Sequence, residues 1–256
     1  MRILTTGVLS GIGKYIHENL GGIGITRSTS AEELEKTKRD GMDVIIHCAF
    51  NSQKDVTSDL LYQYFKDNVF FTNELVSVPH KKFIFFSTVD LYPKSSGTHA
   101  EDELIHINTI KGIYAITKLI SESIVREKGH NFLILRPTTL LGKYSRRNTL
   151  IKIIEGEKEP LFLSGNSRFN YVLHSDILDF ITFSIRNDIR GIFNVASTDN
   201  ILLSEVANLL KKKVLFGTYL YDVGNISNNK VTALFPAFKK TSREILHQFI
   251  EVWESA

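Results

Sequence analysis

The stretch Arg2-Ile-Leu-Thr-Thr-Gly7-Val-Leu-Ser-Gly11-Ile-Gly13 decides the fold of this 256-residue chain. Its first part is a short run of apolar and β-branched residues, which is typical of a buried strand. Three glycines follow, and a helical pattern begins near Ile12. Gly7 permits a tight turn, and Gly13 allows the helix to pack closely. A strand, a glycine-rich loop and a helix in this order predict the first unit of a parallel α/β sheet.

The same alternation continues through the first half of the chain. Apolar runs typical of buried parallel strands recur at 23–26, 43–48, 82–87 and 131–136. Helical patterns lie between them, at Ser30–Arg39, at about Leu60–Val76 and at Ile113–Arg126. We therefore expect a doubly wound, Rossmann-type sheet over residues 1–142, to which the chain returns near residues 170–200.

After Pro137 the pattern loosens. Short strand-like pieces at 161–163, 171–173 and 191–195 mix with helical patterns at 176–186, 204–213 and 241–253. We expect residues 143–256 to form a smaller lobe that covers the substrate.

Composition narrows the class of protein. No run approaches the roughly 18 apolar residues that span a bilayer, and the N-terminus enters a strand pattern at once, so we expect a cytoplasmic protein without membrane contact. Cys48 is the only cysteine, and the histidines have no metal-like spacing, which predicts neither disulfide nor metal. The net charge of +3 comes from scattered basic residues. That pattern argues against nucleic-acid binding and favours an anionic small molecule.

The glycine-rich loop stands where a dinucleotide loop would stand. A backbone without side chains can approach a pyrophosphate, and the helix N-terminus faces the anion. The predicted cofactor contacts in this loop are Gly7, Ser10, Gly11, Ile12 and Gly13. The alternative is that the three glycines serve an ordinary strand-to-helix turn.

The end of the second predicted strand bears on the choice of cofactor. Thr26-Arg27-Ser28 stands where an acidic residue would bind the ribose of NAD. Arg27, with the neighbouring Ser28, can hold a 2′-phosphate, so the sequence favours NADP(H) and leaves NAD(H) open. The alternative is a surface arginine at a strand end.

A phenol and an ammonium lie four residues apart in Tyr114-Ala-Ile-Thr-Lys118. On a helix they share one face, so the ammonium can favour the ionised phenol, although such pairs also arise by chance. Ser87 and Thr88 lie at the carboxyl end of a predicted strand, where ligands bind in such folds. A hydroxyl there can hydrogen-bond a substrate oxygen while Tyr114 moves its proton. Lowering the phenol pKa by ~3 units needs ~4 kcal/mol, which Lys118 and an oxidised nicotinamide can supply.

These motifs, followed by Arg136-Pro137-Thr-Thr-Leu-Leu-Gly142, occur in the order seen in extended short-chain dehydrogenases/reductases. The chain resembles the sugar-nucleotide epimerase/dehydratase group of that family from Met1 to about Trp253. The resemblance implies that Thr88 is the catalytic hydroxyl, Tyr114 the proton donor or acceptor, and Lys118 the group that holds the nicotinamide ribose. It implies further cofactor contacts at Cys48, Ala49, Asn68, Arg136 and Pro137, besides Tyr114 and Lys118.

Candidate substrate contacts are Ser87, Asp90, Arg168 and His174. Asp90 either contacts a sugar hydroxyl or caps a turn. Arg168 stands one residue earlier than the arginine of the family pattern. His174 lies in a segment where the family binds substrate. Only fifteen residues separate Arg27 from Asp43, too few for the usual helix, strand and adenine-contacting acid, so we expect that strand to be lost.

The resemblance also bears on the reaction. Dehydratases of the group carry Asp-Glu directly after the catalytic threonine, where this chain has Val89 and Asp90. Valine cannot protonate a leaving hydroxide, so hydride transfer on a nucleotide-sugar remains. Arg27 tips the choice toward a 4-keto-sugar reductase over a 4-epimerase with tightly bound NAD. A different class is a non-catalytic NADP(H)-binding sensor or scaffold protein.

Two segments keep alternative interpretations. The apolar helix predicted at Leu60–Val76 either pairs with a second copy to make a homodimer or packs inward. The basic residues Lys143 to Arg147 either cover a diphosphate or form a solvated loop.

Overall fold

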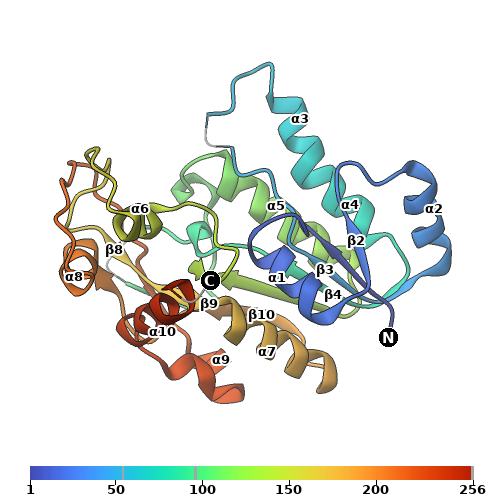
Figure 1. Ribbon diagram of the computed structural model, residues 1–256. Helices are drawn as coiled ribbons and strands as arrows, with labels where there is room; N and C mark the ends of the chain where they lie inside the picture. The colour runs from blue at the N-terminus through green and yellow to red at the C-terminus, as the bar shows by residue number, and fades with distance from the viewer. Residues whose placement is uncertain (54, 95–96, 255–256) are drawn as a thin grey trace.

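The centre of the molecule is a six-stranded parallel sheet (Figure 1). The structure, a computed structural model, describes residues 1–53, 55–94 and 97–254. The strand order is β10-β6-β4-β3-β1-β2, and every neighbouring pair is parallel. The strands are β1 (Ile3–Thr6), β2 (Ile23–Ile25), β3 (Met42–His47), β4 (His80–Phe86), β6 (Phe132–Pro137) and β10 (Gly191–Val195). The flanking helices are α1 (Gly11–Leu20), α2 (Ala31–Asp40), α3 (Leu61–Phe65), α4 (Phe71–Val76), α5 (Ile113–Lys128) and α7 (His174–Arg186). The prediction of a Rossmann-type α/β fold is confirmed, and β10 is the expected return to the sheet.

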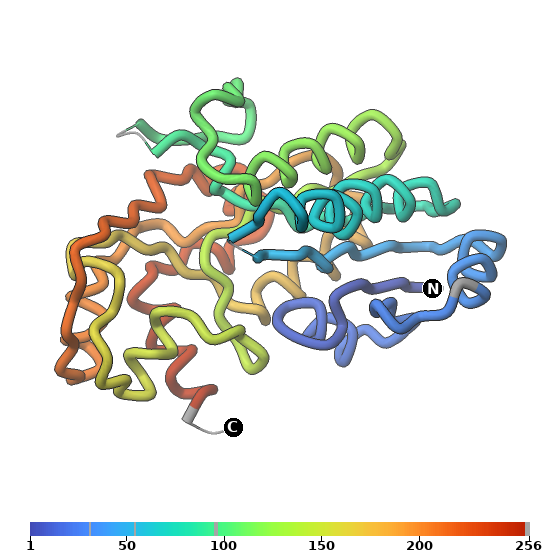
Figure 2. The backbone as a smooth tube through the Cα atoms, turned by 90° about the horizontal axis from the view of Figure 1, so that it is seen from above, coloured from blue at the N-terminus to red at the C-terminus, as the bar shows by residue number. Residues whose placement is uncertain are grey.

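The rest of the chain builds a second group of short elements beside the sheet, and the part of this group that follows β6 is drawn in yellow-green to red in Figure 2. Its strands are β5 (Thr98–His99), β7 (Thr139–Leu141), β8 (Arg168–Phe169), β9 (Tyr171–Leu173), β11 (Ile201–Leu202) and β12 (Asn225–Ile226), which form the pairs β7-β9, β8-β11 and β5-β12. Its helices are α6 (Thr149–Glu155), α8 (Leu203–Leu209), α9 (Asn229–Leu234) and α10 (Ser242–Glu254), and single turns of 3₁₀ helix lie at Val89–Leu91, Ile107–Thr109 and Pro236–Lys239. Residues from β7, α6, β9, α8 and α10 share one apolar core.

Two elements of this second group differ from the predictions. Residues 161–163 form only an isolated bridge, between Leu163 and Tyr219. The helix predicted to reach residue 213 ends at Leu209. Lys211 has a φ of 52°, which a right-handed helix does not accommodate, so the chain turns away there.

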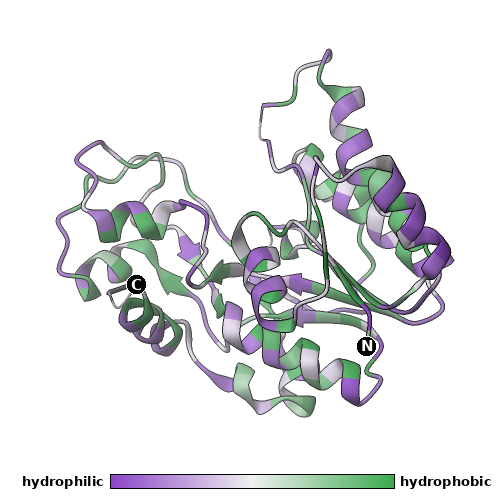
Figure 3. Ribbon diagram, turned by 45° about the vertical axis from the view of Figure 1, so that its right-hand side comes forward, coloured by the Kyte–Doolittle hydropathy of each residue, from purple (hydrophilic) through white to green (hydrophobic). Residues whose placement is uncertain are grey.

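Alternating side chains of β4 fill two cores. Phe83 and Phe85 pack on one face of the sheet with residues of α4 and α5. Ile84 and Phe86 pack on the other face with residues of α1 and α7. Both faces are thus covered, as an apolar parallel sheet requires. Figure 3 shows the strands largely in the green of apolar residues, while purple lies mostly on outer helix faces and loops.

The segment between β2 and β3 contains one helix and no additional strand, as its short length predicts. Ser30 accepts a hydrogen bond from the Glu33 amide while the Glu33 carboxylate accepts one from the Ser30 amide, which fixes the start of α2. The ten residues of α2 then occupy most of the available length, and only Gly41 separates it from β3. Within the described residues, β2 is therefore the edge of the sheet, and the extra strand of the usual pattern is absent.

The long helix predicted at Leu60–Val76 is present, but its middle is wider than an α-helix. A π-helical turn, Lys66–Phe70, separates α3 from α4. Leu75 and Val76 pack inward against the sheet, whereas Tyr62 and Phe70 are 70% and 51% exposed. The C-terminal end of this helical segment therefore packs inward, which is one of the two predicted alternatives. Its N-terminal part leaves apolar side chains exposed. No helix among the described residues is both long enough and apolar enough to cross a bilayer.

A buried ion pair joins β6 to α5. Arg136 donates to both carboxylate oxygens of Glu122, at 2.9 and 2.7 Å, and the two side chains are 3% and 2% exposed. Arg136 also donates to the Tyr92 hydroxyl, which in turn donates to the Asn194 side chain on β10. Two strands and the helix that carries Tyr114 are thus held by one polar network.

We expect Glu122→Gln to lower the free energy of unfolding by about 3 kcal/mol, because it leaves the Arg136 charge buried without its counter-ion. Urea denaturation at neutral pH measures the change. The matched control is Glu205→Gln, which removes an exposed partner of Arg243 at 3.5 Å and should cost less than about 0.5 kcal/mol. An equal loss of unfolding free energy in the two variants would show that the buried pair stabilises the fold no more than an exposed one.

Candidate functional site

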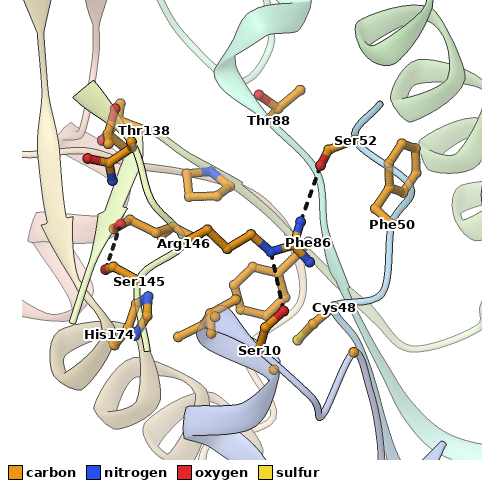
Figure 4. A pocket seen from close by; sticks show the side chains of 18 of the residues that line it. Ser10, Cys48, Phe50, Ser52, Phe86, Thr88, Thr138, Ser145, Arg146 and His174 are labelled. Atoms are coloured by element: carbon orange, nitrogen blue, oxygen red, sulfur yellow. Dashed lines mark hydrogen bonds between the residues drawn. The ribbon is translucent and has the colours of Figure 1, made fainter. Parts of the chain in front are cut away.

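A cavity of about 320 Å³ lies at the carboxyl edge of the sheet (Figure 4). The glycine-rich loop, the end of β4 and the start of α5 line it together with the segment after β7. Of the residues predicted from the sequence, it brings together Gly7, Ser10, Gly11, Ile12, Gly13, Cys48, Ser87, Thr88, Tyr114, Lys118, Pro137 and His174. Among the described residues no three His, Cys, Asp or Glu side chains gather as a metal site would require.

A second cavity of about 850 Å³ adjoins the first on the side of β2 and α3. Arg27 and Ala49, two further predicted cofactor contacts, line it. Ser28 does not line it, and its hydroxyl pairs with that of Thr26 at 2.8 Å. The residues common to both cavities are Gly7, Ser10, Phe50, Ser52 and Arg146. A ligand that occupied both would therefore pass over the glycine-rich loop.

The glycines of this loop leave room for a close approach of backbone. Gly7 has a φ of 76° and Gly11 a φ of 60°, a region that favours glycine. A Cβ on Gly13 would lie 2.5 Å from the Gly7 carbonyl oxygen, so only glycine lets α1 start this close to β1. Ser10 precedes α1 without capping it through its side chain, which leaves amides at the helix N-terminus for other acceptors.

Lys118 is buried in the wall of the first cavity. Its ammonium donates to the Phe86 carbonyl and lies 3.6 Å from the centre of the Phe50 ring. Burial lowers the pKa of Lys118 to about 7, because a charge removed from water is penalised. Phe50 also meets the Tyr114 ring edge-on, with 5.5 Å between centroids. Phe50 therefore packs against both predicted catalytic residues of α5.

The Tyr114 phenol does not have the lowered pKa that the helix spacing suggested. Burial raises the pKa of Tyr114, and the nearby Asp90 carboxylate raises it further, while a hydrogen bond with Thr88 acts in the opposite direction. The Lys118 ammonium lies 5.9 Å from the centre of the Tyr114 ring and bonds elsewhere. In the protein by itself, Tyr114 is therefore a protonated phenol at neutral pH.

The end of β4 presents two hydroxyls to the same cavity. Thr88 accepts a hydrogen bond from the Asp90 amide at 3.1 Å, so Thr88 caps the following turn. Ser87 is 4% exposed and its hydroxyl has no partner among the described residues. Asp90 does not line the cavity, and its carboxylate pairs with Lys94 at 2.9 Å. His174 lines the cavity floor, and burial lowers its pKa to about 4.

Besides Ser28 and Asp90, three more predicted site residues line neither cavity, and other groups of the protein use their polar atoms. Arg136 is engaged by Glu122 and Tyr92, as described above. Asn68 accepts from the Asn51 amide and donates to the Asn51 carbonyl, so it holds the loop after β3. Arg168, on β8, bonds the side chains of Asp222 and Asn225. Asn68 and Arg136 line neither cavity, so the cofactor contacts that the resemblance implies for them stay predictions.

Arg27 meets a carboxylate that sequence analysis did not single out. Its guanidinium is 82% exposed and donates to Asp67 at 2.9 Å. Asp67 lines the second cavity and also accepts from Asn51 and Gln63. Asp67 is four residues after Gln63 on the helix, but only the fold brings it to the end of β2.

Sequence analysis also missed Phe50 and left Arg146 undecided. Phe50 directly follows Cys48 and Ala49, two predicted cofactor contacts. This position next to them is the sequence feature that could have indicated a role in the site. Arg146 reaches across the first cavity and donates to Ser10 at 3.3 Å and to Ser52 at 3.2 Å, as Figure 4 shows. The basic segment after Gly142 thus lies over the glycine-rich loop.

Solved structures share this architecture over nearly the whole chain. A dTDP-4-dehydrorhamnose reductase from Clostridium acetobutylicum is similar with a TM-score of 0.82 and 18% identity, over 99% of this chain and 100% of that one. The reductase of that name from Bacillus anthracis, solved with NADP, has a TM-score of 0.80 and 18% identity, with 97% and 98% covered. UDP-glucuronic acid 4-epimerase from Bacillus cereus, solved with UDP-glucuronic acid and NAD, has a TM-score of 0.78 and 18% identity, with 100% and 99% covered.

The sequence itself matches a family model. The family is described as the NAD dependent epimerase/dehydratase family, and the match covers residues 6–196, well over half of the chain. That range includes the glycine-rich loop, Thr88, the Tyr114 and Lys118 helix, and the return strand β10. The chain therefore belongs to the NAD-dependent epimerase/dehydratase family.

Proposed function

We propose that this protein reduces the keto group of a nucleotide-sugar with NADPH, as a 4-keto-sugar reductase. One observation carries the proposal: Thr88, Tyr114 and Lys118 line a single cavity that begins at the glycine-rich loop. A group that donates a proton, a hydroxyl beside it and a cation are what reduction of a carbonyl needs. The reductases among the similar structures agree with this reaction.

The two adjoining cavities fit a nicotinamide dinucleotide. Gly7 and Gly13 leave the space that a Cβ would fill, and the N-terminus of α1 favours an anion there. The adenosine half fits the second cavity, where Arg27 would take a 2′-phosphate, and the nicotinamide half fits the first, beside Lys118. Cys48, Ala49 and Pro137 complete the walls. NADPH supplies the hydride when bound.

The residues of the chain handle the proton. The phenol of Tyr114 is protonated at neutral pH because its pKa is raised, so it can donate to the substrate oxygen. Thr88 hydrogen-bonds the phenol and lies beside that oxygen's position in the cavity. Lys118 supplies a cation whose pKa of about 7 keeps it partly charged at neutral pH. Phe50 covers the Lys118 ammonium and limits the access of water.

The substrate enters from the side of the second group of elements, which we take as a lobe spanning residues 143–256. Ser87 and His174 face the cavity with polar atoms that lack partners among the described residues, and we propose that they contact the sugar. Asp90 raises the Tyr114 pKa but does not line the cavity, so a contact with a sugar hydroxyl would require its carboxylate to leave Lys94. Arg168, held by Asp222, lies farther along β8 and would meet only the nucleotide end.

A 4-epimerase with bound NAD is the second candidate. Asp67 favours it, because a carboxylate at the adenosine cavity can accept hydrogen bonds from ribose hydroxyls, as NAD sites commonly provide. Asp67 and Arg27 form an ion pair at this cavity. In this scheme Asp67 would bind the ribose of NAD, and Arg27 would bind the 2′-phosphate of NADP. A non-catalytic NADP(H) sensor is disfavoured by the convergence of Thr88, Tyr114 and Lys118.

The uncovered face of α3 and the π-helical turn suits a homodimer, which belongs to the same proposal. Leu61, Tyr62 and Phe70 are all exposed on this face, and Tyr62 and Phe70 also line the second cavity, so a second copy would lie beside the proposed adenosine site. An apolar helix face of this kind is commonly buried against a second copy of the chain.

Replacing Tyr114 with phenylalanine should lower turnover of a 4-keto nucleotide-sugar by at least about 100-fold, because the proton donor is lost. Binding of NADPH, followed by fluorescence titration, should change by less than about twofold. The control Tyr219→Phe removes the hydroxyl of an exposed tyrosine whose ring stacks on Phe162. This variant should keep full activity. Retention of most of the rate by Tyr114→Phe would remove the catalytic assignment.

Arg27→Ala should weaken NADPH binding by roughly tenfold, about 1.4 kcal/mol, and leave NADH binding nearly unchanged. The companion variant Asp67→Asn should weaken NADH binding and spare NADPH. Both are measured by titration of the cofactor-free protein, after denaturation of a sample to identify any nucleotide it retained. Retained NAD together with no NADPH preference in the wild type would favour the epimerase.

The buried Lys118 should make stability depend on pH. Since burial lowers its pKa from 10.5 to about 7, the folded protein binds fewer protons than the unfolded chain between these values. The free energy of unfolding should therefore rise with pH across this window, by roughly 1 kcal/mol per unit. Lys118→Met lacks the titrating group and should show a smaller rise. Parallel pH profiles of the two proteins in urea between pH 7 and 9 would contradict the lowered pKa.

A further inference from the structure

Arg146 is the one cationic side chain that lines both cavities among the described residues. It shares this position with Gly7 and Ser10 of the glycine-rich loop and with Phe50 and Ser52 of the loop after β3. In a nicotinamide dinucleotide the diphosphate lies between the two nucleosides. A dinucleotide that fills both cavities must therefore pass its charged middle along this shared wall.

The charge of Arg146 has no counter-ion within the described part of the chain. Its guanidinium bonds two neutral hydroxyls, those of Ser10 and Ser52. The adjacent Arg147, in contrast, pairs with Glu155 and Glu157 at 3.1 and 3.2 Å. The positive charge of Arg146 also acts within the first cavity, where it lowers the pKa values of Tyr114 and Lys118. The cavity thus contains an unbalanced positive charge.

The segment that carries Arg146 is fastened to the glycine-rich loop and α1. The Tyr144 carbonyl accepts a hydrogen bond from the Gly11 amide at 2.9 Å, and the Tyr144 hydroxyl donates to Glu18 on α1. Lys14 lies over the Tyr144 ring at 4.3 Å. Figure 2 shows this yellow-green segment beside the blue loop. The Tyr144 carbonyl therefore uses only the first amide of α1, and it fixes the segment that carries Arg146 beside the N-terminus of that helix.

From this arrangement we propose that Arg146 binds the diphosphate of the nicotinamide dinucleotide, and that residues 142–148 form a strap that fastens over the glycine-rich loop around it. The inference rests on the proposed function. It adds a residue that binds phosphate and that comes from the segment after β7 and not from the glycine-rich loop. Two polar atoms that lack partners, the Ser87 hydroxyl and His174 Nδ1, line the same cavity and are 4% and 2% exposed as residues. A ligand with polar groups is therefore what the cavity accommodates.

A nucleotide-sugar also carries a diphosphate, so the chemistry alone fits two sources. The position favours the cofactor, because Arg146 bonds Ser10, the residue that precedes α1. A substrate diphosphate would instead approach from the side of β8, where Arg168 lies. The two sources differ in which ligand loses affinity when Arg146 is changed.

The test is equilibrium binding to Arg146→Ala, with Lys143→Ala as the matched control. Lys143 carries the same charge in the same segment but does not line either cavity. We expect Arg146→Ala to raise the dissociation constant of NADPH at least about tenfold, and Lys143→Ala to change it by less than about twofold. Adenosine 2′-monophosphate, which has no diphosphate, should bind the wild type and Arg146→Ala equally.

The strap gives an independent readout, because Lys143, Arg146 and Arg147 are cleavage sites for trypsin. NADPH should slow tryptic cleavage at Lys143 and Arg147 in the wild type and fail to do so in Arg146→Ala. Arg146→Gln repeats the test should the alanine variant fold poorly.

The outcomes separate the two proposals. NADPH binding that is unchanged in Arg146→Ala overturns this inference and leaves the proposed function standing. A selective loss of UDP affinity, with NADPH binding intact, assigns Arg146 to the substrate and overturns it as well. A wild-type protein that binds no nicotinamide nucleotide ends the proposed function, and this inference with it.

Discussion

The ion pair between Arg136 and Glu122 is the interaction on which the rest of the site depends. It joins β6 to α5 in an environment from which water is excluded, and the network continues through Tyr92 to Asn194 on β10. A buried pair of this kind tolerates little change in geometry, because each charge has only the other to balance it. The helix that carries Tyr114 and Lys118 is therefore set at a fixed height over the end of β4, where Ser87 and Thr88 lie.

The cavity above this network carries more positive than negative charge. Lys118 is buried against Phe50, which lowers its pKa to about 7, and Arg146 adds a second positive charge without a carboxylate partner among the described residues. The N-terminus of α1 contributes partial positive charge from the same direction. Such a cavity is best balanced by an anionic ligand, and a dinucleotide supplies negative charge at its middle.

The sequence anticipated the parts of the site that lie at the ends of regular elements. Thr88 follows the end of β4 by two residues, Tyr114 and Lys118 share one face of α5, and the glycine-rich segment runs from the end of β1 into the first turn of α1. These positions follow from strand order and helical spacing, which short-range patterns encode. For other family positions the structure shows protein partners. Asn68 bonds the loop after β3 and Arg136 bonds Glu122 on α5, as buried polar groups commonly do, and their cofactor contacts stay predictions.

The sequence by itself determined the α/β class, the loss of a strand between Arg27 and Asp43, and the order of the family motifs. These are consequences of local propensity, segment length and periodicity. Only the tertiary structure decided which charges meet. The pairing of Arg27 with Asp67, the covering of Lys118 by Phe50, and the reach of Arg146 to Ser10 all join segments tens of residues or more apart. These contacts, and the lowered pKa of Lys118, depend on burial and distance in three dimensions, which no pattern along the chain specifies.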